Sequence, residues 1–217
     1  SNALTPLEYI AKYNQLQPNK AVAFLSAEGK NKDIFAAAQT TLNSVCPCFS
    51  LTLTTSNPLS VFRSTTGLAN DISYDMPWGK DGYLATNSLI AMMVLIVRAY
   101  DDHFKSQVDC EWIKHRRQQL RRQNVLQKFQ ASRSIVILYG QIGRIAALDL
   151  ESKLAESALA VSELCDYRQF AHGRHLQFAS SKTPLVVAFT SPQDKRLSDE
   201  TLSLLPNYVP ILKLDLP

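Results

Sequence analysis

Short apolar runs recur along this chain, and segments with helical spacing lie between them. The runs that predict strands are Ala21–Leu25, Phe49–Thr54, Ile135–Leu138, Ala160–Leu164, Pro184–Phe189 and Val209–Leu214. Three of the six, Ala21–Leu25, Ile135–Leu138 and Pro184–Phe189, are apolar throughout. Such strands are typical of parallel sheets whose two faces are both covered by helices. The pattern therefore predicts an α/β fold.

Apolar residues at helical spacing predict the helices. These cover 34–42, a long stretch after Gly82, 112–129, 145–159 and 197–205, and 165–178 is predicted as a loop with helical turns. The helix after Gly82 contains the longest apolar run, Leu89–Val97. A bilayer span needs about 20 apolar residues, roughly twice this length. We therefore expect a buried helix and no membrane partner.

The strand–helix rhythm is interrupted once, by a basic helical segment. It contains Lys114, His115, Arg116, Arg117, Arg121 and Arg122. We expect two lobes, each a parallel sheet flanked by helices: residues 4–106, then a basic inter-lobe helix at 107–130, then residues 131–217. The first lobe offers few strands, and Ser1–Ala3 has the sequence of a protease-cleavage remnant. We therefore expect an incomplete first lobe from a longer protein.

Composition narrows the classes of protein. The 217 residues are 46% hydrophobic and 19% charged, which excludes a disordered or collagen-like chain. Lys and Arg number 23 against 19 Asp and Glu, a net charge of +4. This falls short of a dedicated nucleic-acid binder, and the basic residues of 114–122 wrap more than one helix face. We expect no nucleic-acid partner; the alternative is that this helix binds DNA.

Cysteine and histidine spacing gives no metal motif. Cys46 and Cys48 form C-P-C, Cys110 and Cys165 stand alone, and His103, His115, His172 and His175 lack the i, i+4 zinc spacing. We expect free thiols in a reducing cytoplasm, with no metal and no cofactor.

Two turns and one helix could carry chemistry. Parallel sheets bind ligands beyond the carboxyl ends of their strands, and the Ser26–Asn31 and Gly140–Gly143 turns occupy such places. In the following helix, Asp149, Lys153 and Glu156 share one face. That face is either a solvated surface with an Asp149–Lys153 pair, or a base, a cation and a second carboxylate lining a cleft.

These features resemble the SIS (sugar isomerase) family, in particular the isomerase half of glucosamine-6-phosphate synthase. That family has a helix of the form L-E-G-A-L-K-L-K-E, then K-H-G-P and a strand. Here the helix is Leu148–Glu156 (LDLESKLAE), followed at the same gap by His172-Gly173 and by Pro184–Val187. Residues 26–31 (SAEGKN) take the place of the S-x-S-G-x-T phosphate turn, and 80–88 (KDGYLATNS) resemble the start of the last first-lobe helix.

The resemblance implies roles for individual residues. Glu156 would be the base that moves a proton between C1 and C2 of an open-chain phosphosugar. His172 would open the sugar ring in the neighbouring subunit's site, which implies a homodimer. Lys153 would stabilise charge on the substrate oxygen, and Asp149 replaces a family glutamate. The implied binding residues are Ser26, Gly29, Lys30, Asn31, Thr86, Asn87, Gly140, Gly143 and Arg144.

Departures from the family leave two functions open. Glu28 and Asn31 stand where the phosphate turn carries hydroxyls, and a carboxylate is unfavourable beside a phosphate. The family's G-T-S turn, its imine-forming lysine tail and its glutaminase domain are absent from this sequence. The first hypothesis is therefore a phosphosugar isomerase or a related deglycase. The alternative is a sensor that binds a sugar phosphate without converting it.

Overall fold

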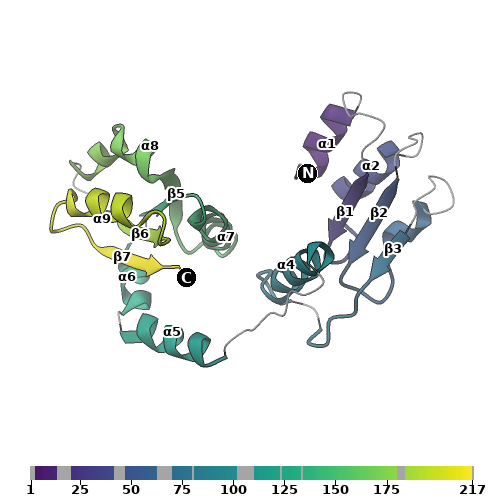
Figure 1. Ribbon diagram of the computed structural model, residues 1–217, viewed down its shortest axis with the longest axis horizontal. Coiled ribbons are helices and arrows are strands. Elements are labelled where there is room, and N and C mark those ends of the chain that lie inside the picture. The colour runs from purple at the N-terminus through teal and green to yellow at the C-terminus, as the bar shows by residue number, and fades with distance from the viewer. Residues whose placement is uncertain are drawn as a thin grey trace. The chain divides into compact units, whose positions relative to one another are not determined.

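The structure is a computed structural model that describes residues 3–13, 21–41, 47–62, 70–79, 81–101, 110–122, 124–132, 134–179 and 184–216. It divides into two compact units, Ser1–Gln107 and Val108–Pro217. Each unit contains a parallel β-sheet flanked by helices, which confirms the predicted α/β class (Figure 1).

The first unit is built on a three-stranded parallel sheet. Its strands are β1 (Val22–Ser26), β2 (Cys48–Thr52) and β3 (Asn70–Ser73), in the order β1-β2-β3. Ser26 is in register with Thr52, and Thr52 with Ser73, so the carboxyl ends of the three strands share one edge. The first two strands were predicted. β3 was not, because an edge strand with largely exposed side chains has no apolar pattern.

Two helices and a short 3₁₀ helix cover this sheet. They are α1 (Pro6–Lys12), α2 (Lys32–Thr40) and the 3₁₀ helix η3 (Pro58–Phe62). Figure 1 shows α1 and α2 together beside β1. Tyr9 of α1, Phe24 of β1 and Ala37 and Ala38 of α2 are buried in one core. This core holds the turn between β1 and α2 in place.

The long apolar helix differs most from what the sequence predicted. It is α4 (Asn87–Tyr100), and its start agrees with the prediction. The expected burial is wrong: Ile90 is 63% exposed and Met93 45%, and Ser88 is its one buried residue. A helix becomes buried only where another surface covers it, and the pattern of its own residues does not specify that surface. No helix in the described ranges is long and apolar enough to cross a membrane.

The second unit is built on a four-stranded parallel sheet. Its strands are β4 (Ser134–Tyr139), β5 (Val161–Asp166), β6 (Leu185–Thr190) and β7 (Ile211–Asp215), in the order β5-β4-β6-β7. All four were predicted to within a few residues. The helices between them are α7 (Gly143–Glu156), α8 (Tyr167–Ala171), the 3₁₀ helix η4 (Arg174–Ala179) and α9 (Lys195–Ser203).

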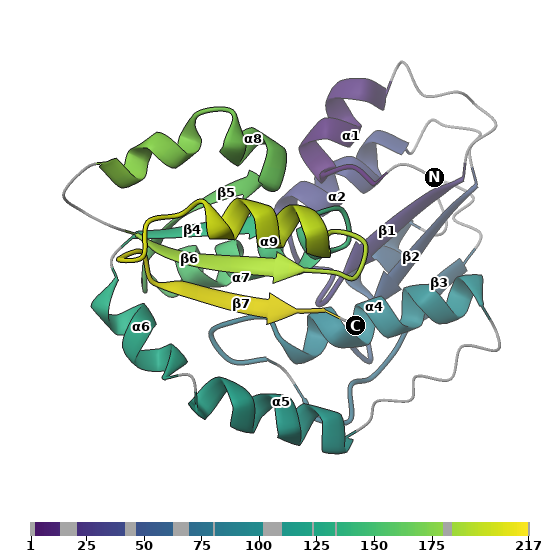
Figure 2. The same ribbon diagram turned by 60° about the vertical axis from the view of Figure 1, so that its left-hand side comes forward.

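The two central strands of this sheet, β4 and β6, are buried on both faces, as their apolar runs predicted. Ile135 and Ile137 of β4 face the core formed with Ala147 and Leu154 of α7. Val136 and Leu138 face the opposite core, which includes the large aromatic side chains of α8 and η4. Figure 2 shows α9 and α7 on opposite sides of the strands. Helices therefore pack against both faces of the sheet, α7 on one and α8, η4 and α9 on the other.

The basic segment forms two helices instead of one. They are α5 (Cys110–Arg122) and α6 (Val125–Ala131), and both belong to the second compact unit. Asn124 has φ of 50°, in the left-handed region, and this turns the chain between them. A similar change ends α7: Ala158 lies inside the helix predicted over 145–159 but beyond the end of α7, with φ of 53°.

Candidate functional site

The turn after β1 occupies the place of the predicted phosphate turn. Gly29 has φ of 67°, and its N–H donates to Ser26 Oγ at 3.0 Å. Asn31 Oδ1 accepts from the N–H groups of Asp33 (2.7 Å) and Ile34 (3.4 Å), which caps α2. Lys30 is exposed. The Ser26 hydroxyl can still donate its own hydrogen to a ligand, whereas the Asn31 carbonyl oxygen is committed to the helix.

Thr52 adds a polar group beneath this turn. It ends β2, is fully buried, and its Oγ1 has no hydrogen-bond partner in the structure. A Cβ on Gly29 would lie 3.1 Å from Thr52 Cγ2, so the threonine packs directly against the turn. A buried hydroxyl without a partner is unfavourable by about 1–3 kcal/mol. Thr52 therefore packs its methyl group against the turn and keeps its hydroxyl buried.

The predicted residues Thr86 and Asn87 stand at the start of α4. There the Asp81 carboxylate accepts from the N–H groups of Asn87 and Ser88, both at 2.8 Å, and from Thr86 Oγ1 at 3.2 Å. These hydrogen bonds, above all those from Ser88, hold the pKa of Asp81 well below its usual value. In this structure Thr86 and Asn87 thus serve to begin the helix.

A carboxylate borders the second predicted turn, after β4. The Asp194 side chain occupies the space where a Cβ on Gly140 would lie. Asp194 is held there by Ser191, whose Oγ donates to Asp194 Oδ2 at 2.6 Å. Gly143 packs tightly on Phe189, since a Cβ there would lie 3.0 Å from Phe189 Cβ. Arg144 is exposed. This turn is consequently less suited to an anion than its glycines suggested.

On α7 the polar face divides into two pairs. Lys153 Nζ forms an ion pair with Asp149 Oδ1, as the i, i+4 spacing predicted. Ser152 Oγ donates to Glu156 Oε1 at 2.8 Å, and Glu156 is exposed. In the described part of the chain no cation pairs with Glu156. Its carboxylate is thus an available base.

Two buried aromatic side chains orient the segment that carries His172. Asp166 Oδ1 caps α8, accepting from the Arg168 and Gln169 N–H groups at 2.9 Å each. Tyr167 and Phe170 are each 1% exposed. Residues i and i+4 of a helix share a face, so Arg168 and His172 both project outward one turn apart, and both are exposed.

The remaining cation and imidazole of this segment are engaged. Arg174 pairs with Glu163, and this hydrogen bond raises the pKa of Arg174 above its usual value. His175 Nδ1 lies 3.3 Å from the Phe170 carbonyl oxygen.

The topology separates the predicted residues of the second unit. Glu156 ends α7, just before β5 begins, whereas His172 follows α8, beyond the other end of β5. Six residues of strand span about 20 Å. The Gly140–Arg144 turn lies at the start of α7, also about 20 Å from Glu156 by helix length. One chain therefore does not place His172, or this turn, beside Glu156.

Metal and thiol chemistry have little support in the described residues. Within them, no group of three or more His, Cys, Asp or Glu side chains could hold a metal ion. Cys48 and Cys165 are buried thiols, and burial raises the pKa of Cys165 to about 11. Cys46 and His103 lie outside the described residues.

Comparison with known proteins identifies the architecture. No family model and no curated protein matches the sequence. Among solved structures, tagatose-6-phosphate ketose/aldose isomerase from Escherichia coli has a TM-score of 0.68 at 17% identity, over 91% of this chain and 57% of that one. Glucosamine-6-phosphate deaminase from Thermotoga maritima has a TM-score of 0.63 at 14% identity, over 98% and 71%.

The C-terminal domain of glucosamine-fructose-6-phosphate aminotransferase from Francisella tularensis has a TM-score of 0.54 at 12% identity, over 95% of this chain and 68% of that domain. The fold is of the SIS type. At these identities the likeness concerns the fold alone, and the chain spans between 57% and 71% of these three structures.

Three residues of this SIS-type fold were not singled out from the sequence. Thr52 and Asp194 reach the two turns only because β2 pairs with β1 and β6 with β4. Nothing in their local sequence marks them. Arg168 stands four residues before His172 in a segment rich in cations, but the family resemblance assigned it no role. All three bear on whether an anionic sugar can bind.

Proposed function

We propose that the protein binds a hexose phosphate and interconverts its aldose and ketose forms. We further propose that its two compact units are two SIS-type lobes, and that Glu156 is the catalytic base. The observation that carries this proposal is the state of Glu156, which stands on an SIS-type fold with an exposed carboxylate that no described cation neutralises. A paired carboxylate would be a weaker base.

The reaction needs a proton moved between adjacent carbons. Glu156 would take the proton from C2 of the open-chain aldose, leaving an enediolate, and return it to C1, while the O2 hydroxyl proton passes to O1 to give the ketose. Lys153 would stabilise the negative charge on the substrate oxygen, at the expense of its pairing with Asp149. General-base and electrostatic stabilisation of this kind each contribute about 10²–10⁴ in rate. No co-reactant is consumed.

His172 would reach the site from a second subunit. Its position at the far end of β5 from Glu156 supports this arrangement, since one chain does not bring the two together. The surroundings of Glu156 support it too: Leu159 is 72% exposed and Val161 77% exposed. A second copy that covers these apolar side chains would exclude water from the carboxylate. The proposed enzyme is accordingly a homodimer with shared sites.

The turn of the first unit offers groups suited to binding a phosphate. Ser26 and the exposed Lys30 offer a donor and a positive charge. These groups would offset Glu28, the carboxylate in the turn.

Isotope exchange tests the catalytic role. The protein is incubated with fructose-6-phosphate or glucose-6-phosphate in deuterium oxide, and incorporation at C1 and C2 is followed by NMR. We expect Glu156→Gln to lower the exchange rate at least 100-fold, in keeping with loss of a general base. Glu151→Gln makes the same chemical change on the same helix and should stay near the wild-type rate. Exchange that survives in Glu156→Gln would contradict the proposal.

Mixed dimers test the shared site. Glu156→Gln and His172→Asn are each expected to be inactive, but a mixed dimer keeps one intact site. Refolding the two variants together in equal amounts should restore about a quarter of the wild-type rate, since half of the dimers are mixed. No recovery would exclude the shared site.

The second candidate function is a sensor that binds the sugar phosphate without converting it. The commitment of Asn31 to the α2 cap and the carboxylate of Glu28 in the turn favour it. Saturable binding by calorimetry without any exchange would establish the sensor. If neither binding nor exchange is observed, both functions are refuted.

A further inference from the structure

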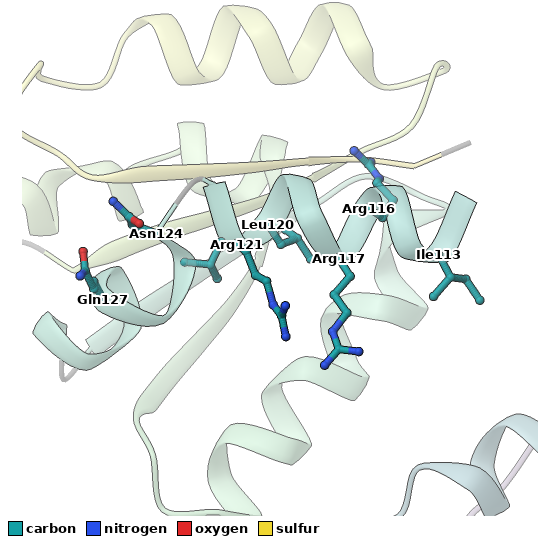
Figure 3. Close-up of a pocket in the computed structure, with 8 residues that line it drawn as sticks. Ile113, Arg116, Arg117, Leu120, Arg121, Asn124 and Gln127 are labelled. Atoms are coloured by element: carbon teal, nitrogen blue, oxygen red, sulfur yellow. The ribbon is translucent and has the colours of Figure 1, made fainter. Parts of the chain in front are cut away.

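The second unit contains a cavity that none of the proposed sugar-site residues lines. Its volume is ≈ 610 Å³ (Figure 3), within the range of about 300–1,000 Å³ typical of small-molecule sites. It is lined by Ile113, Arg116, Arg117, Leu120, Arg121, Asn124, Val125 and Gln127. All of these come from α5, from α6 or from the turn between them.

The chain turn at Asn124 creates this cavity. The left-handed backbone at Asn124 ends α5 and redirects the chain into α6, so the two helices form an elbow. Ile113 and Leu120 of α5 and Val125 of α6 form its apolar wall. Ile113 is 48% exposed, so this wall keeps apolar surface in contact with water. A ligand with an apolar body would remove that surface from water.

Two arginines give the cavity its charge. Arg117 and Arg121 are one helical turn apart, and Figure 3 shows both side chains extending from the same side of α5. Arg116 extends the other way: it donates to Gln119 Oε1 at 2.7 Å and to the Asp215 carbonyl oxygen. In the described ranges neither Arg117 nor Arg121 forms an ion pair.

The described residues that line the cavity include no carboxylate. Two guanidinium groups beside an apolar wall, without an internal counter-charge, are complementary to an anion attached to an apolar group. We infer that this cavity binds a small amphiphilic anion, meaning an aromatic or aliphatic body that carries a phosphate, sulfonate or carboxylate. The body lies against Ile113, Leu120 and Val125, and the anionic group lies between Arg117 and Arg121.

Other ligands fit these features less well. A phosphosugar has an anionic group but no apolar body to cover the wall. Duplex DNA is bound by rows of cations along a polar surface, whereas the neighbouring Lys114 is paired with Glu111 at 2.7 Å. A second copy of the chain would need an acidic and apolar surface in register with the elbow. The apolar wall beside two arginines favours the small molecule.

Binding of 1-naphthyl phosphate to the full chain tests this inference. The protein is titrated with this probe at fixed ionic strength, and the intrinsic fluorescence of the probe is followed. 1-Naphthol and inorganic phosphate, which each lack one half of the molecule, are compared with it. We expect saturable binding of one equivalent, with both partial probes at least tenfold weaker. Arg117→Gln and Arg121→Gln should each raise Kd about tenfold, the loss of one charge-assisted hydrogen bond. Arg122→Gln is the matched control, because Arg122 is adjacent in sequence, carries the same charge and does not line the cavity; it should change Kd less than twofold.

Each alternative gives a different result, and each would overturn the inference. If Arg122→Gln weakens binding as much as Arg121→Gln, the effect is general electrostatics. If inorganic phosphate binds equally well, the apolar wall has no role. Displacement of the probe by duplex DNA, with a steep salt dependence, would identify a nucleic-acid surface. Dissociation of a dimer in Arg117→Gln or Arg121→Gln, measured by sedimentation, would identify an interface between copies. Sugar-phosphate exchange is measured separately, so loss of one activity does not imply loss of the other.

Discussion

The Tyr167 hydroxyl connects α8 to the end of β6 inside the second unit. It donates to the Phe189 carbonyl oxygen at 3.0 Å and lies 3.2 Å from Thr190 Oγ1, which in turn lies 2.7 Å from Ser198 Oγ of α9. Burial raises the pKa of Tyr167 above its usual value. Tyr167→Phe removes this hydroxyl and keeps the buried ring. The change therefore isolates the hydrogen bonds from the packing.

We expect Tyr167→Phe to lower the free energy of unfolding by about 1.5–2 kcal/mol. About 1 kcal/mol is the net value of one hydrogen bond, and the rest comes from leaving the Phe189 carbonyl without this donor. Thr190 keeps its bond to Ser198. The matched control is Tyr208→Phe. Tyr208 also donates to a carbonyl oxygen at 3.0 Å but is 63% exposed, so water can replace it and the loss should stay below about 0.5 kcal/mol.

Urea unfolding followed by circular dichroism measures both variants. A tyrosine whose pKa is raised in the folded state stabilises the fold below its unfolded pKa of about 10, and this contribution is lost as pH rises above that value. The difference between the wild type and Tyr167→Phe should therefore narrow above pH 10. Equal losses in Tyr167→Phe and Tyr208→Phe, or a difference that does not change with pH, would refute the reasoning.

Two further substitutions test local features of the first unit. Gly29 and Gly79 have φ of 67° and 71°, but a Cβ on Gly29 would lie 2.8 Å from Pro58 Cδ and one on Gly79 would meet nothing within 4 Å. Both alanine variants should lose about 1 kcal/mol from the left-handed backbone, and Gly29→Ala a further 1–3 kcal/mol from crowding; equal losses in urea unfolding would contradict this. Hydrogen bonds lower the pKa of Asp81 in the folded protein. The ionised carboxylate therefore stabilises the fold at pH values above the ordinary pKa of 3.8, and this stabilisation is lost as the pH falls below that value. Asp81→Asn should therefore lower stability at pH 7 and reduce the acid-induced loss of the 222 nm helical signal, while Asp75→Asn changes neither.

The strands of the second unit were predictable because both faces of the sheet are buried. Nearly every residue of a central strand such as β6 is apolar, and the run Pro184–Phe189 is therefore a strong signal. Strand β3 has no such signal, since its side chains are largely exposed. The same limit explains α4, whose apolar composition predicted burial although most of its side chains are exposed. Composition reports the tendency to be buried and does not report the covering surface.

The candidate site was predictable only where its residues are neighbours in sequence. The Asp149–Lys153 pair follows from helical spacing alone. The approach of Asp194 to Gly140 does not, because 54 positions separate them and their meeting requires β4 to pair with β6. Thr52 reaches Gly29 by the pairing of β1 with β2 in the same way.

The amino-acid sequence alone determined the α/β class, the strand positions and the residues that share a helix face, because these depend on periodicity over a few residues. Tertiary structure decided which groups meet: a carboxylate beside one glycine turn, a buried hydroxyl beside the other, and two arginines over an apolar elbow. It also decided that Glu156 and His172 lie at opposite ends of β5. Strand order and chain direction set these distances, and both arise from contacts between residues far apart in the sequence.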